Sequence, residues 1–106
     1  VVGPRLHERA HEGQLEQVLR LGKLAATDRV GARPNLVYRH RIHDEQLIIS
    51  CYGAEIRLPE HAAESALHAL ENESFVIADL PGDLDDPGKV VLTKRLVREG
   101  LVRILS

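Results

Sequence analysis

The 106-residue sequence predicts an α+β fold, and three patterns support this prediction. Alternating apolar residues between positions 36 and 58 are typical of short strands. A helical pattern, a short extended piece and one turn follow over residues 60–85, and a capped helical pattern then runs from Asp86 to Gly100. This order, closed by a short apolar strand, is that of a winged helix, a variant of the helix-turn-helix. We expect a winged helix with an N-terminal helical lead-in and a small antiparallel β-meander.

The lead-in helix is expected over residues 14–29. Its apolar stripe contains Leu15, Val18, Leu19 and Ala25 or Ala26. Leu21 and Leu24 fall outside this stripe, and a helix that is apolar on more than one side needs more than one neighbour. We therefore interpret residues 1–33 as a helical linker or dimerisation segment that packs on a missing domain or on a second copy. The alternative is a core helix with two ordinary exposed leucines.

The meander begins after Pro34, whose ring disfavours the α conformation for the residue before it. Strands are expected over 36–43, 46–52 and 55–59, with Asp44-Glu45 and Gly53 in the turns. The face expected to be apolar carries Leu36, Tyr38, Ile42, Leu47, Ile49, Cys51, Ile56 and Leu58, with His40 as an exception. Cys51 is the single cysteine, so no internal disulfide can form, and we expect it to act as a small buried hydrophobe.

A helix is expected over residues 60–71, directly after Pro59. Its stripe consists of Ala62 or Ala63, Ala66, Leu67 and Leu70, and such small residues allow a neighbour to approach closely. The stretch FVIADLPG, residues 75–82, predicts a short extended piece followed by one turn around Leu80.

The last helix is expected to have Asp86 as its N-cap and Pro87 at its first helical position. Gly100 supplies the C-terminal stop. The stretch LVRIL, residues 101–105, predicts the final strand. Residues 34–106 would thus form the winged-helix domain.

Charge is nearly balanced, with 14 basic and 16 acidic residues, but it is unevenly placed. Residues 1–35 carry a net charge of +2 and residues 36–106 carry −4. A domain that binds nucleic acid by neutralising phosphates usually shows the reverse in its binding half.

The cations of the last helix and strand form the candidate binding face for a partner or a nucleic acid. They are Lys94, Arg95, Arg98 and Arg103. In a helix-turn-helix, however, base edges are reached from the N-terminal part of the recognition helix, where this chain has Asp83, Asp85 and Asp86. Acidic residues at the start of a helix and cations at its end also complement the helix dipole. We therefore favour a protein partner, with a DNA-binding regulator as the alternative.

The sharpest metal-binding motif is His7-Glu8-Arg9-Ala10-His11, an H-E-x-x-H. On a helix this spacing places two imidazoles on one face, with a glutamate able to activate a zinc-bound water. The positions where a metzincin would continue hold Gln14 and Gln17 in place of glycine and histidine. His7, Glu8 and His11 are therefore only a weak zinc candidate, and we expect no metal site.

His43-Asp44-Glu45 fits the H-x-D/E pair that begins the facial triad of non-haem iron oxygenases. The pair falls between two alternating strands, where Asp-Glu is ordinary hairpin composition, so we favour a turn. There is no G-x-S-x-G, glycine-rich phosphate loop or CxxC. We expect a chain without catalytic residues.

The chain contains no methionine and opens on VVGPRLHERA, which leads us to expect a piece of a longer protein. No run approaches the roughly 18 apolar residues of a membrane helix, and nothing resembles a signal peptide. We expect a cytoplasmic protein that does not enter membranes.

Three phrases carry a resemblance to a known family: IRLPEHAAESALHAL after a strand pair, FVIADLPG, and LTKRLVREGLVRIL. Together with RVGARP they resemble the C-terminal winged-helix region of JmjC-type cupin proteins, the bacterial relatives of the ribosomal oxygenases, over residues 30–106. The resemblance implies a parent protein hydroxylase whose iron and 2-oxoglutarate bind in an upstream cupin domain outside this chain. It also implies that residues 1–33 help such proteins dimerise and that the winged helix is an interaction module contacting the cupin domain or another protein.

Overall fold

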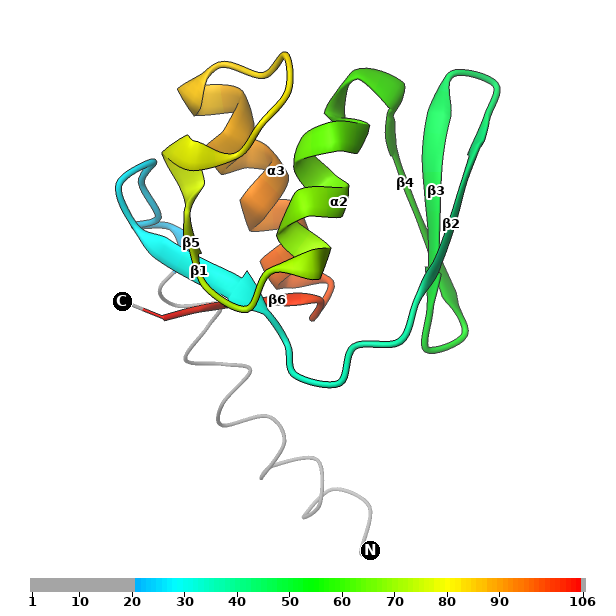
Figure 1. Cartoon of the computed structure of the whole chain (residues 1–106), viewed down its shortest axis with the longest axis horizontal. Helices are drawn as coiled ribbons and strands as arrows, with labels where there is room; N and C mark the ends of the chain where they lie inside the picture. Colours follow the sequence, from blue (N-terminus) through cyan, green and yellow to red (C-terminus); the bar gives the residue numbers. More distant parts are fainter. Residues whose placement is uncertain (1–20, 106) are drawn as a thin grey trace, which may run out of the picture.

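The structure, a computed structural model, describes residues 21–105 and confirms the α+β class (Figure 1). Within these residues, two helices, α2 (Ala63–Glu71) and α3 (Asp86–Arg98), accompany two small antiparallel sheets. Helix α2 packs against α3 and against strand β1 (Arg29–Ala32). None of the described helices is long and apolar enough to cross a membrane.

The first sheet, hereafter the meander, confirms the three predicted consecutive strands. It contains β2 (Arg39–His43), β3 (Gln46–Cys51) and β4 (Ala54–Pro59), paired in the order β2-β3-β4. Each turn has two residues, Asp44-Glu45 and Tyr52-Gly53, and all four have positive φ between 52° and 79°. This is the backbone of the tight hairpin turns whose twist matches that of the flanking strands.

The buried face of the meander agrees with the prediction for β3 and β4 and differs for β2. Leu47, Ile49, Cys51, Ile56 and Leu58 are buried as expected. Strand β2 is exposed along its whole length, and Ile42, expected on the apolar face, is 49% exposed.

One apolar residue of the meander is buried on the opposite face. Ile48 is 1% exposed, and its neighbours across the two strand pairs are Arg41 and Arg57. Long arginine stems can cover an apolar side chain while their charged ends stay in water. Strand β3 therefore buries apolar side chains on both of its faces at its centre.

The second sheet contains a strand that the sequence did not predict. Strand β1 lies in the middle, between β5 (Phe75–Val76) and β6 (Val102–Ile104). The expectation that the lead-in helix continues to Arg29 is therefore wrong. Asp28 closes a turn instead, with its carboxylate accepting a hydrogen bond from the Ala25 N–H at 2.8 Å, and the strand begins at the next residue. Part of the stretch 1–33 assigned to a linker thus belongs to this sheet.

The backbone that connects α2 to β5 passes very close to Gly31, at the centre of β1. A Cβ atom at this position would lie 1.8 Å from the carbonyl oxygen of Glu73 and 2.9 Å from the backbone nitrogen of Ser74. The neighbouring Ala32 N–H donates to the Asn72 carbonyl at 2.8 Å, which holds the two segments together. Only a residue without a side chain fits between them.

Leu21 and Leu24 correct the interpretation of the lead-in. Both are buried in the single core cluster, at 8% and 7% exposure. They are therefore not exposed, and residues of this chain already cover them without a second copy. Residues 14–20 of the proposed dimerisation segment 14–29 lie outside the described residues.

The helical predictions hold with small shifts. The segment expected to begin a helix at Glu60 opens with one 3-10 turn, η1 (Glu60–Ala62), and continues as α2. Ala66 and Ala69 in α2 are completely buried, as expected for small residues that allow close packing. The turn predicted after the extended piece is present as η2 (Ile77–Asp79).

The start of α3 lies one residue earlier than expected. Asp85 is the N-cap, and its carboxylate accepts a hydrogen bond from the Gly88 N–H at 2.8 Å. Asp86 is therefore the first helical residue, and Pro87 occupies the second position, where its missing N–H costs nothing. At the other end Gly100, with φ of 84°, confirms the predicted stop, and β6 follows.

This cap gives a direct test. We expect Asp85→Ala to lower the free energy of unfolding by about 1 kcal/mol, because the Gly88 N–H loses its side-chain acceptor. Asp86→Ala is the matched control, since it removes the same charge one residue away from the cap and should cost less. Urea unfolding of the two variants provides the comparison. An equal loss in both would contradict the assignment.

Candidate protein-binding groove

The four cations expected to form one binding face do not share one environment. Arg98 is exposed, whereas Lys94, Arg95 and Arg103 are half-buried. Lys94 and Arg98 are one helical turn apart on α3. The Nε of Arg95 donates to the Glu99 carboxylate at 2.9 Å. Arg103 lies on β6 opposite Gly31, and its Nε is buried without a hydrogen-bond partner among the described residues.

The candidate metal motifs have different outcomes. His7, Glu8 and His11 lie outside the described residues. His43 and Asp44 lie at the turn between β2 and β3, which confirms the hairpin interpretation, and their side chains approach to 3.2 Å while largely exposed. Within residues 21–105 no group of three or more histidine, cysteine or acidic side chains is placed to hold a metal ion.

Cys51 has the expected structural role. Its side chain is buried, and the thiol donates to the Val37 carbonyl oxygen, with Sγ at 3.1 Å. Burial raises the pKa of this thiol and so favours its protonated, unreactive form.

A groove of about 400 Å³ lies between the end of β4, η1 and helix α3. Its apolar lining includes Leu58, Leu84, Val91 and Leu92. The ionisable side chains that line it are Arg57, His61 and Arg95, and none is acidic. The groove is therefore apolar with a basic rim, on a domain whose overall charge is −2.

Helix α3 contributes one continuous face to this groove. Leu84 just before the helix, then Gly88, Val91 and Arg95, follow one another at three- and four-residue spacing. Val91 is 67% exposed although the neighbouring Leu92 is only 5% exposed. The helix thus presents an apolar side chain to solvent beside a hollow, while its opposite side packs into the core.

Strand β4 contributes an open edge. It pairs only with β3, and the two-residue turn before it makes Cys51 and Ala54 the first hydrogen-bonded pair. Because such pairs alternate with pairs that do not bond, the N–H and C=O groups of Glu55 and Arg57 are directed away from β3. Among the described residues these groups have no backbone partner.

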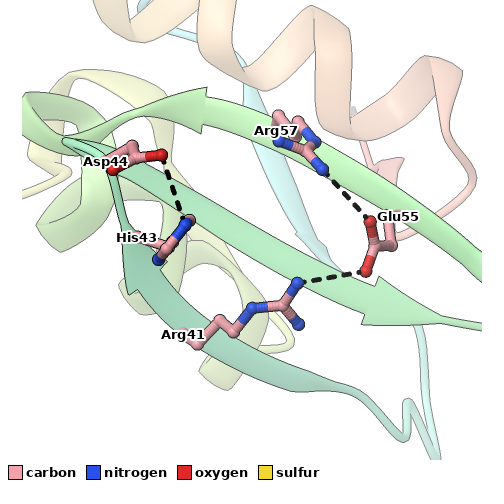
Figure 2. A network of polar contacts seen from close by, with 5 residues as sticks. All are labelled: Arg41, His43, Asp44, Glu55 and Arg57. Atoms are coloured by element: carbon pink, nitrogen blue, oxygen red, sulfur yellow. Dashed lines mark hydrogen bonds and ion pairs between the residues drawn. The ribbon is translucent and has the colours of Figure 1, made fainter.

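The outer face of the meander carries an exposed ion-pair network, shown in Figure 2. The carboxylate of Glu55 lies 3.4 Å from the guanidinium of Arg41 and 3.6 Å from that of Arg57. All three side chains are about half exposed, so each pair contributes little to stability. Arg57 thus stays exposed at the edge of the sheet, with its charge in contact with solvent.

A second, more open hollow of about 760 Å³ adjoins the groove and shares Pro59 and His61 with it. Its ionisable lining is almost entirely acidic, from Glu45, Glu60, Glu64 and Asp83, with His61 shared between the two hollows. The groove and this hollow are therefore adjacent surfaces of opposite charge.

No protein-family model and no curated protein matches this chain. The groove was not predicted from the sequence. The signal that could have indicated it is the spacing of Leu84, Gly88 and Val91 on the side of α3 opposite the core residues Leu96 and Val97.

Proposed function

We propose that this domain is a winged-helix module, non-catalytic in itself, that binds a protein partner. Support for the fold comes from the order α2, β5, η2, α3 and β6, which is the predicted order of a winged helix. The three-stranded sheet formed by β5, β1 and β6 packs beside these helices.

The proposed function depends most on which side chains the N-terminal half of α3 exposes. The N-terminal half of this helix, which reads bases in helix-turn-helix proteins, presents the exposed Val91 and is preceded by Asp83 and Asp85. Carboxylates repel phosphates, whereas an exposed apolar side chain beside a hollow favours contact with a protein surface. A protein partner therefore fits this helix better than DNA.

The family resemblance extends this proposal to a larger protein. A JmjC-type cupin oxygenase would hold iron and 2-oxoglutarate in its upstream domain and use this module in the cytoplasm to contact that domain or another protein. This part of the proposal depends on the phrases within residues 30–106 alone.

A DNA-binding regulator is the second candidate, because Arg98 is exposed and Lys94 lies one turn before it. That function requires affinity for duplex DNA that falls steeply as salt rises.

Site-specific photo-crosslinking in cells tests the two functions together. We expect a benzophenone amino acid at position 91 to form protein adducts that are absent when it is placed at Tyr52, which is equally exposed, at 72%, on a hairpin turn. Adducts to nucleic acid at position 91, or protein adducts no stronger than at position 52, would contradict the proposed function.

A further inference from the structure

We propose that the groove binds an extended segment of a partner protein that carries acidic and apolar side chains and adds as a fourth strand to the open edge of β4. This inference rests on the proposed function, since it specifies the form and chemistry of the partner. Three properties of the groove carry it: the free backbone groups of β4, the apolar wall of α3, and the sign of the charges at the rim.

The backbone of β4 offers hydrogen bonds that only an extended chain satisfies as a set. Glu55 and Arg57 each present one N–H donor and one C=O acceptor on the side away from β3. Pro59 has no N–H and ends this row at the side of η1. The added strand is therefore short, and its main chain bonds to these two residues.

The position of α3 gives the added strand a second contact surface. The groove is lined from one side by residues 57–59 of β4 and from the other by Leu84, Val91 and Leu92. The main chain of the added strand faces β4, and its side chains alternate between the two faces of the sheet. Every second residue of the ligand therefore points toward α3. Apolar residues at those positions would cover Val91, which is otherwise 67% exposed. Addition of a strand to a sheet edge beside an apolar pocket is an established mode of peptide recognition.

The charges at the rim select the remaining residues of the ligand. Arg57, His61 and Arg95 line the groove, and no acidic side chain does. Arg57 and Arg95 have partners in Glu55 and Glu99, but these pairs are exposed and contribute little, so a ligand carboxylate can replace or share them. Acidic residues between the apolar ones are thus favoured, and basic ones are disfavoured.

The test begins with selection of binders from a random dodecapeptide phage library on the immobilised 106-residue chain, followed by affinity measurements on the selected peptides. We expect sequences that alternate Asp or Glu with Val, Ile or Leu. Val91→Glu should weaken their binding at least tenfold, whereas the control Val37→Glu, an exposed valine outside the groove, should leave it unchanged.

Two substitutions at position 57 separate the contribution of the backbone N–H to peptide binding from that of the side chain. Arg57→Ala removes the guanidinium and keeps the N–H, whereas Arg57→Pro removes both, at an edge position where proline is tolerated. We expect the proline variant to bind roughly tenfold more weakly than the alanine variant, which corresponds to about 1.4 kcal/mol. If the proline variant does not fold, an ester in place of the amide of Arg57, introduced by ligation at Cys51, removes the N–H and keeps the guanidinium; it is compared with the unmodified chain.

Each other outcome overturns strand addition. No selected peptide, equal binding to the proline and alanine variants, equal binding to the ester variant and the unmodified chain, or peptides that become helical on binding would do so. Self-association of the chain that is lost in the N–H-deleted variant would assign the edge to a second copy instead. If position 91 still crosslinks to protein in cells under any of these outcomes, the proposed function stands and only the mode of recognition is wrong.

Discussion

Gly31→Ala is expected to destabilise the domain by about 3 kcal/mol, a large share of the stability of a chain of this size. The added methyl group would lie 1.8 Å from a backbone oxygen at Glu73, and a backbone atom cannot rotate away as a side chain can. Relief requires β1 to separate from the segment that leads into β5, which breaks the middle of the sheet. Urea unfolding followed by circular dichroism measures the loss.

Gly22→Ala is the matched control for this substitution. An added Cβ at Gly22 meets no atom within 4 Å, so the same chemical change should alter the free energy of unfolding by no more than about 0.5 kcal/mol. Similar losses at both positions would show that the close approach at Gly31 is not the cause.

Leu96→Ala in α3 is expected to cost about 3 kcal/mol. Leu96 is completely buried in the core, and truncation removes its apolar contacts and leaves a cavity. Val91→Ala on the same helix should change the free energy of unfolding by less than about 0.5 kcal/mol, because Val91 is 67% exposed. The pair is compared by thermal and urea unfolding. A large cost at Val91 would mean that this side chain supports the fold and is not available to a partner.

Local patterns were sufficient for most of the fold. The meander followed from alternation and turn residues, because its strands are consecutive and each hairpin is closed by two residues. The last helix followed from aspartates before it and Gly100 after it. The N-cap was misplaced by one residue, since two adjacent aspartates both satisfy the capping preference and only the hydrogen bond to Gly88 distinguishes them.

Strand β1 could not be predicted by the same means. RVGA is too short to show a period, and it contains a glycine, which is unfavourable in strands. Its partners are β5 and β6, both distant in the sequence, so nothing near it indicates pairing. The burial of Leu21 and Leu24 depends on the same unpredicted turn and strand.

The candidate site was predicted only in part. The sequence predicted that the cations of α3 and of the last strand form one binding face. In the structure Arg95 lines the groove, whereas Arg103 lies on β6. A groove depends on the approach of β4 and α3, two elements separated in the sequence by η1, α2, β5 and η2, and no local pattern reports that distance.

The central place of β1 also determines when the domain can become complete during synthesis. The meander arises from one continuous stretch, residues 39–59, so its hairpins can close as soon as that stretch is free. In the other sheet, β1 must wait for β6 (Val102–Ile104), which is synthesised after all the other described strands. Until then one edge of β1 remains unpaired, and β6 is the strand that covers it.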